Sequence, residues 1–195
     1  MSFTGKKGAE AIPFSAISKF LSEGLGYGGE GDVLCAISVL ILQKLCGIGN
    51  FVEMFTTDYK KDRIFMSHMG ETNLKMAKDE RAIRLVKKDM ALIKNGLATA
   101  MFLFPLKPGK VTLLNIAPGK DGFRFIACEG EIMDEPLFKD IVSPHFLLKV
   151  HGEVEEFLTE YSCLGGTHHL AMTYGNRKEE LRFLSEILNI SFFEI

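Results

Sequence analysis

The stretch Val111-Thr-Leu-Leu-Asn-Ile-Ala-Pro-Gly-Lys-Asp-Gly-Phe-Arg-Phe-Ile-Ala-Cys128 decides the fold, because two short apolar runs flank a turn rich in proline, glycine and charge. Further apolar runs lie on either side of it, at 98–104 and 146–150. Pro105-Leu-Lys-Pro-Gly109 and Glu129-Gly130 mark other turns. Short apolar runs at regular intervals between such turns predict an antiparallel sheet or a small barrel.

Helical patterns precede this region. An apolar stripe marks the first helix: Phe14, Ile17, Phe20 and Leu21. It should end at the glycine-rich residues 24–29. A second helix is expected between Asp32, a good N-cap, and about Gly47, and it is apolar on nearly every side, as buried helices are. Strand-like runs follow at 50–56 and 64–68.

The pattern changes near residue 73. Residues 73–88 are charged and weakly periodic, which is typical of a connector. Three elements are expected after the β-rich region: helices at 154–161 and 178–188, and a strand at 190–195. We therefore expect an α/β remnant in residues 1–73, followed in residues 74–195 by a mainly antiparallel β-barrel-like domain with flanking helices.

The composition indicates a cytoplasmic globular protein. The 195 residues are 47% hydrophobic, which is enough for the core of one or two domains, and the formal net charge of −2 gives no indication of a nucleic-acid partner. The most apolar run, 33–45, is shorter than the ~20 residues of a membrane span, and the first fifteen residues lack the apolar core of a signal peptide. The widely spaced cysteines predict reduced thiols: Cys35, Cys46, Cys128 and Cys163.

Two glutamates are candidates for chemistry. Glu53 interrupts the apolar run 51–55, where a buried carboxylate needs a cation or a role, although an edge strand would let it face water. Glu71 follows Gly70 at the end of another apolar run, where a ligand can approach the backbone closely, although a solvated turn gives the same pattern. His68 is interpreted as a core or hydrogen-bonding histidine.

The segment Gly165-Gly-Thr-His-His169 is the third candidate. Adjacent side chains diverge, so one of His168 and His169 could bind an ion and the other a substrate hydroxyl, while a surface loop with incidental histidines is the alternative. His145 and His151 have no such context, and we expect them at the surface or at caps.

Together these residues suggest a metal site. Glu53, Glu71 and one histidine of the 165–169 segment offer oxygen and nitrogen ligands that suit Mn²⁺ or a similar divalent ion with open positions for water or substrate. No cysteine lies close in sequence to the glutamates, which argues against structural zinc.

At these residues the sequence resembles the L-arabinose/L-fucose isomerase family, particularly its arabinose branch. Four stretches carry the resemblance, in order: Gly26–Asp32 is similar to GYGFGAEGD, Phe51–Glu53 to FMED, Ser67–Glu71 to SHMLE and Gly165–His169 to GGAHH. The resemblance implies an aldose–ketose isomerase that moves a proton between C1 and C2 of a sugar through a cis-enediol.

The resemblance also implies residue roles. Glu53 and Glu71 correspond to the paired carboxylates that bind the metal and act as acid and base, His169 to the metal-ligating histidine, and His168 to a neighbour that faces the substrate. The arabinose branch has a further histidine ligand some seventeen residues after the second glutamate, where this sequence has Lys88.

The length also departs from the family pattern. Family members carry an N-terminal domain and most of a central α/β domain ahead of the GYG segment, so the chain corresponds to the C-terminal portion. The implied partners are a sugar, further copies of the chain, and a separate chain that supplies N-terminal domains. Two alternatives stay open: a non-catalytic carbohydrate-binding or oligomerisation module derived from the family, and, more weakly, a metal-dependent hydrolase.

Overall fold

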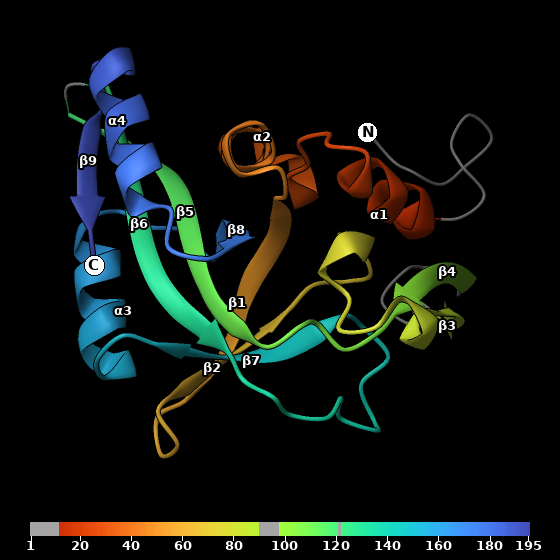
Figure 1. The fold of residues 1–195 in the computed structure, drawn as a ribbon. Helices are drawn as coiled ribbons and strands as arrows, with labels where there is room; N and C mark the ends of the chain where they lie inside the picture. The colour runs from red at the N-terminus through yellow and green to blue at the C-terminus, as the bar shows by residue number, and fades with distance from the viewer. Residues whose placement is uncertain (1–11, 90–97, 121) are drawn as a thin grey trace.

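The structure is a computed structural model that describes residues 12–89, 98–120 and 122–195 (Figure 1). Its helices are α1 (Phe14–Ser22), α2 (Val33–Cys46), α3 (Val154–Cys163) and α4 (Lys178–Leu188), with short 3₁₀ turns η1 (Gly29–Gly31), η2 (Leu74–Met76) and η3 (Glu80–Ala82). Its strands are β1 (Asn50–Asp58), β2 (Arg63–Ser67), β3 (Arg84–Asp89), β4 (Ala98–Leu103), β5 (Gly109–Gly119), β6 (Gly122–Ile132), β7 (His145–Val150), β8 (His169–Tyr174) and β9 (Ser191–Glu194).

Seven strands form one sheet that closes on itself. The order is β5-β8-β1-β2-β7-β6-β9, and β5 also pairs with β6. That additional pairing runs from Gly109 opposite Ile132 to Gly119 opposite Gly122, so the 111–128 stretch is a long antiparallel hairpin. The six strands other than β9 thus make a closed but uneven ring. Strand β9 is not part of the ring and pairs in parallel with residues 124–127 of β6.

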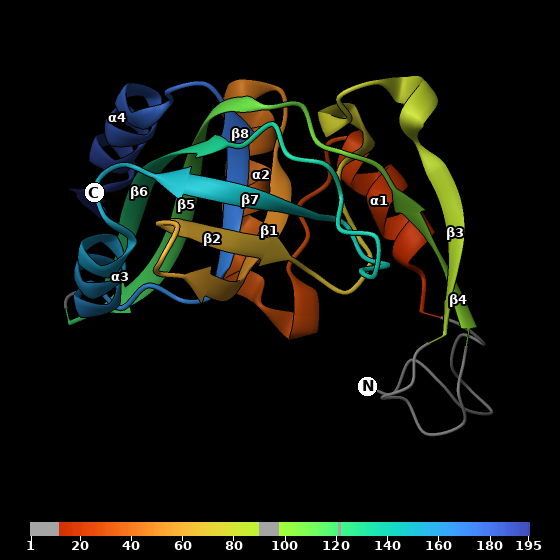
Figure 2. The same ribbon diagram turned by 90° about the horizontal axis from the view of Figure 1, so that it is seen from below.

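The strands of the ring carry two apolar cores because successive side chains point to opposite faces. In β5, Leu113 belongs to the cluster inside the ring, whereas Leu114 packs outside it with residues of α2 and α4. Seven consecutive residues of β5, from 111 to 117, are therefore buried. Helix α2 crosses the outside of β1, β5 and β8, and α4 contributes to the same outer cluster. Helices α3 and α4 lie at the end of the molecule away from α1 (Figures 1 and 2).

The residues on the two sides of position 73 share this sheet. Strands β1 and β2, which precede position 73, lie between β8 and β7, which follow it. Asn73 itself joins several elements: its backbone N–H donates to Asn50 Oδ1 at 2.7 Å, and its side-chain amide donates to the carbonyls of Leu21 and Gly49 at 3.1 and 2.9 Å. The change of sequence pattern near this position thus coincides with a buried polar junction.

Three elements differ from the sequence-based expectation. The run 98–104 was expected among the regularly spaced strands, but among the described strands β4 pairs with β3 alone, in a separate two-stranded sheet beside α1 (Figure 2). The expected connector 73–88 accordingly contains most of β3. Strand β8 was not expected, because residues 169–173 are all buried and so show no alternation of polar and apolar side chains.

Helix α2 begins and ends where the sequence predicts. The Asp32 carboxylate accepts a hydrogen bond from Cys35 N at 2.9 Å, and Gly47 ends the helix in the left-handed conformation with φ of 76°. The expectation that it is buried between other layers is wrong, because several of its apolar residues are exposed: Val33, Ile37, Leu40 and Leu45. Among the described helices, none is long and apolar enough to cross a membrane.

Candidate metal centre

The candidate residues come together where β1 meets β8. Glu53 on β1 lies directly opposite His169 at the start of β8, and the backbone N–H of Met54 donates to the His168 carbonyl at 2.9 Å. The pairing of β1 with β2 shifts register just after this point, between Met54 and Thr56. Such irregularities re-aim side chains and are frequent beside functional sites.

Glu53 lies between two imidazoles. Its Oε2 is 3.9 Å from His68 Nε2 and its Oε1 is 3.9 Å from His168 Nε2. Its side chain is 19% exposed, compared with 5% for His68 and 58% for His168. The carboxylate thus faces the cluster with one exposed and one buried histidine, at distances longer than a direct hydrogen bond.

His169 is fixed by a carboxylate on its far side. Its Nδ1 donates to Asp32 Oδ2 at 3.2 Å, while Asp32 Oδ1 caps α2 through Cys35 N. The residue is 4% exposed, and its Nε2 has no hydrogen-bond partner among the residues that the structure describes. A histidine with one nitrogen held by a carboxylate and the other left open has the arrangement of a metal ligand.

Glu71 is the most buried acidic candidate, at 1% exposed. Its Oε2 accepts a hydrogen bond from Gly70 N at 3.0 Å, and its Oε1 is 2.6 Å from His68 Nδ1. The two atoms are close but poorly aligned for a hydrogen bond, so Glu71 Oε1 and His68 Nδ1 both lack a hydrogen-bond partner within the described part of the chain.

Tyr27 lies near this carboxylate. Burial, with the Glu71 carboxylate as the next cause, raises the pKa of Tyr27 far above its usual range, so Tyr27 stays protonated.

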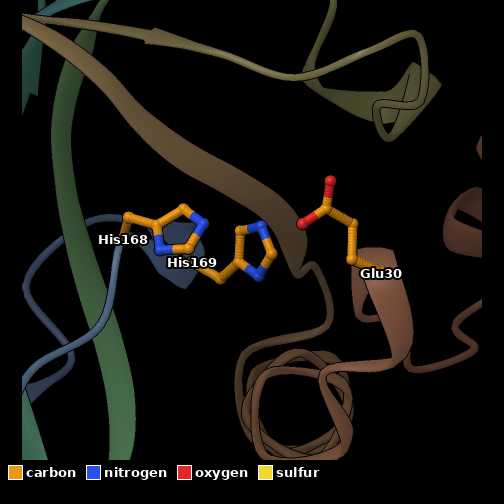
Figure 3. Close-up of side chains that lie close together, drawn as sticks. All are labelled: Glu30, His168 and His169. Atoms are coloured by element: carbon orange, nitrogen blue, oxygen red, sulfur yellow. The ribbon is translucent and has the colours of Figure 1, made fainter.

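Two triplets of possible ligands emerge from this geometry. Glu53, His68 and His169 each place one ligand atom within 4.8 Å of the other two, and so do Glu30, His168 and His169. We call these the inner triplet and the outer triplet. Figure 3 shows the outer one, in which the Glu30 carboxylate points toward the His169 ring.

The triplets contain some, but not all, of the residues that the sequence predicts as metal ligands. Glu53 and His169 share the inner triplet, but within the described ranges neither triplet contains Glu71, and His68 stands in its place. His68 is indeed buried, as expected, yet its contacts make it a member of the site. Sequence reasoning gave Glu30 no role and Asp32 only a capping role, although both lie in the Gly26–Asp32 segment that carries part of the family resemblance.

Lys88, at the place of the family's additional histidine, lies near Glu71. Its Nζ donates to Ser143 Oγ at 2.6 Å and to the Met69 carbonyl at 3.3 Å. Burial lowers the pKa of the Lys88 ammonium, and the Glu71 carboxylate opposes this shift. The ammonium therefore balances part of the carboxylate's charge.

The remaining histidines lie away from the triplets. The expectation of a surface or cap position is wrong for His145, which is 3% exposed; its Nε2 accepts from Phe138 N at 2.8 Å and its Nδ1 donates to the Ser143 carbonyl at 2.7 Å. Burial lowers the pKa of His145, which fits a neutral, structural histidine. His151 is exposed, as expected.

The cysteines are free thiols in different environments. Cys35 and Cys128 are buried, Cys46 is partly buried and Cys163 is exposed. Burial raises the pKa of Cys35 and of Cys128 far above the usual value, so both stay protonated.

Comparison with known proteins identifies the class of this chain. Residues 48–191 match the sequence model of the L-arabinose isomerase C-terminal domain. The chain is 24% identical to the sulfoquinovose isomerase of Priestia megaterium over 92% of its own length and 39% of that relative. It is 25% identical to the L-arabinose isomerase of Saccharophagus degradans, over 99% of the chain and 39% of the relative.

These matches place the chain in a family whose named members are sugar isomerases. More particularly, it belongs to the L-arabinose isomerase C-terminal domain family, which confirms the resemblance seen in its motifs. The chain spans about two fifths of the length of the relatives it matches.

Proposed function

We propose that this chain is the metal-binding C-terminal portion of an aldose–ketose sugar isomerase. The observation that carries the proposal is His169, which is buried, held at Nδ1 by Asp32, open at Nε2 and opposite Glu53 in the paired strands. Glu53 and His169 lie within the region that matches the family, and Asp32 lies before it.

The donor atoms suit the metal expected from the sequence. Carboxylate oxygens and imidazole nitrogens, without thiolate, are ligands for Mn²⁺ and similar divalent ions. We propose Glu53 and His169 as two of the ligands. The third is Glu71 if the family pattern holds, or His68 if the inner triplet binds as it stands.

The residues of the chain divide the chemistry between them. A bound divalent ion would polarise the carbonyl of the sugar and hold its two neighbouring oxygens. Glu71, a buried carboxylate, is suited to take a proton from one of the two carbons and return it to the other, with Glu53 as its counterpart. His168 is exposed beside Glu53 and is placed to contact a sugar hydroxyl.

Metal binding tests this proposal directly. Titration of the purified chain with Mn²⁺ should show binding that Glu53→Gln and His169→Asn each weaken by roughly 10–100-fold. Comparing Glu71→Gln with His68→Asn then identifies the third ligand. Glu131→Gln and His151→Asn, two exposed residues outside both triplets, are the matched controls. Equal binding by Glu53→Gln, His169→Asn and the unaltered chain would contradict the proposal.

Turnover is a separate test, because the relatives are longer than this chain. We expect the chain alone to convert L-arabinose, L-fucose and sulfoquinovose poorly at saturating Mn²⁺, since substrate positioning supplies up to roughly 7–11 kcal/mol of a barrier. Turnover at ordinary enzymatic rates of ~1–10³ per second that is lost in Glu71→Gln would show that the chain is a complete enzyme.

The alternative of a non-catalytic carbohydrate-binding or oligomerisation module has one specific observation in its favour. The Lys88 ammonium, held by Ser143 and Met69, already compensates part of the charge of Glu71. Such a module would bind sugar, or associate, without added Mn²⁺ and with no change in Glu53→Gln. Calorimetry with sugar in the presence of a chelator, together with sedimentation of both proteins, distinguishes the two functions.

A further inference from the structure

Aromatic side chains continue the outer face of the sheet beside Glu53. The chain neighbours of Glu53 on β1 and of Phe65 on β2 all pack with the core inside the ring of strands, so Glu53 and Phe65 point to its outer face. Strands β1 and β2 pair with Met54 opposite Met66, so Glu53 and Phe65 lie on either side of that pair. A ligand that rests on Glu53 can therefore extend over Phe65 on the same face.

A β-bulge adds a second phenylalanine to this face. Met54 and Thr56 pair with consecutive residues of β2, so Phe55 is the extra residue between them. The centroids of the Phe55 and Phe65 rings are 6.1 Å apart and the rings are inclined at 80°, which is an edge-to-face contact. Phe55 is nevertheless 63% exposed. Since bulges re-aim side chains beside functional sites, its exposure indicates a surface that contacts a ligand.

Phe138 is the third ring of this surface, and His145 holds it in place. The rings of Phe138 and His145 stack with centroids 5.5 Å apart and an angle of 10°, and the Phe138 ring stacks on Phe65 at 5.8 Å and 25°. The backbone N–H of Phe138 also donates to His145 Nε2 at 2.8 Å. Phe138 is 42% exposed, whereas His145 is buried. Because the rings are already held in position, a ligand that stacks on them has little side-chain ordering to bring about.

We propose that Phe55, Phe65 and Phe138 form an aromatic platform for the end of the sugar that does not react. The inference deepens the proposed function and rests on it for the position of the reacting end at Glu53. The face of a phenylalanine ring is apolar and carries partial negative charge, so it packs favourably against C–H groups and unfavourably against an anion. The platform therefore selects an aldose whose far end is apolar, such as the methyl group of a deoxy sugar, over one whose far end carries a sulfonate.

Calorimetric titration of the Mn²⁺-saturated chain with L-fucose, L-arabinose and sulfoquinovose tests the platform. L-fucose should bind about fourfold more tightly than L-arabinose, because it has one further methyl group to bury, and sulfoquinovose should bind most weakly. Phe55→Ala and Phe138→Ala should each weaken L-fucose binding roughly tenfold, the size of one lost aromatic contact. Phe123→Ala removes a similarly exposed ring (52%) from β6 and should bind like the unaltered chain. The Mn²⁺ affinity should be the same in all four proteins.

The separate measurement of Mn²⁺ affinity distinguishes this inference from the proposed function. If the chain binds Mn²⁺ but not L-fucose, or if Phe55→Ala and Phe138→Ala leave L-fucose affinity unchanged, the platform is refuted while the metal proposal stands. Tighter binding of sulfoquinovose than of L-fucose would also refute it, because a cation would then set the specificity. If the unaltered chain binds no Mn²⁺, the proposed function fails, whereas L-fucose binding that is lost in Phe55→Ala would still support the platform.

Two further measurements exclude trivial explanations. Phe55→Leu and Phe138→Leu keep an apolar side chain but lose the ring, so they should weaken L-fucose binding while circular dichroism and thermal melts match those of the unaltered chain. Sedimentation reports whether the surface binds another chain instead. Variants that change sedimentation without changing sugar affinity would refute the platform.

Discussion

Replacing Asp32 by serine should weaken metal binding while leaving the fold nearly as stable. The two carboxylate oxygens of Asp32 have separate tasks: Oδ1 accepts from Cys35 N at 2.9 Å and caps α2, and Oδ2 accepts from His169 Nδ1 at 3.2 Å. Serine caps helices about as well as aspartate, so the change in the free energy of unfolding should stay within about 0.5 kcal/mol. The serine hydroxyl offers no second acceptor to His169, so the imidazole loses the partner that fixes its tautomer.

The loss of that partner sets the size of the effect. Removing a carboxylate behind a metal-binding histidine typically costs 10–100-fold in affinity, or about 1.4–2.7 kcal/mol. Calorimetric titration with Mn²⁺ measures this loss, and thermal unfolding without metal measures stability. Asp32→Ala is the control, because it should lose the same affinity and also about 1 kcal/mol of capping, or roughly 2–4 °C in Tm. Unchanged Mn²⁺ affinity in Asp32→Ser, or equal destabilisation by serine and alanine, would refute the separate roles of the two carboxylate oxygens.

Three further predictions concern η1, the polar junction and the thiols. Gly29→Ala should weaken Mn²⁺ binding about tenfold by displacing His68. Gly31, with φ of 84°, has open space around it, so Gly31→Ala should cost only about 1–2 kcal/mol of stability. Calorimetry measures the Mn²⁺ affinity of both variants, and thermal melts measure their stability. Asn73→Ala should lower the free energy of unfolding in urea by about 1–3 kcal/mol, because its amide leaves the Leu21 and Gly49 carbonyls with one donor fewer; an unchanged midpoint would contradict this. Cys163 should react first with a thiol reagent at neutral pH, and Cys35 and Cys128 only on unfolding, as mass spectrometry of the labelled peptides can establish.

The parts of the fold that the sequence predicted are those with local signals. Helix α2 has an N-cap at Asp32, which accepts a hydrogen bond from the residue three positions later. It ends at the left-handed Gly47, directly after its last residue. The hairpin of β5 and β6 pairs two apolar runs up to Gly119 opposite Gly122. Each of these signals depends on neighbours along the chain, so it can be recognised without knowing the tertiary structure.

The elements that were missed depend on burial from distant segments. Strand β8 has β1 on one side and β5 on the other, and its two faces pack into the two cores, which erases the alternation that marks an ordinary strand. His145 is buried because the Phe138 N–H and the Ser143 carbonyl occupy both ring nitrogens. A lone histidine at the start of an apolar run gives no sign of such partners.

The candidate site has the same division between local and distant information. Glu53 and His169 were recognised from their own segments, and the structure pairs them across β1 and β8. Asp32 was recognised only as a helix cap, since its contact with His169 spans 137 positions in the sequence. That contact ties the N-terminus of α2 to β8, and Glu30 lies only two residues before Asp32. The inner and outer triplets therefore both depend on one structural condition, the docking of the η1–α2 junction against His169, and this explains why a capping residue, a left-handed glutamate and a closely packed glycine stand together in the segment 29–32.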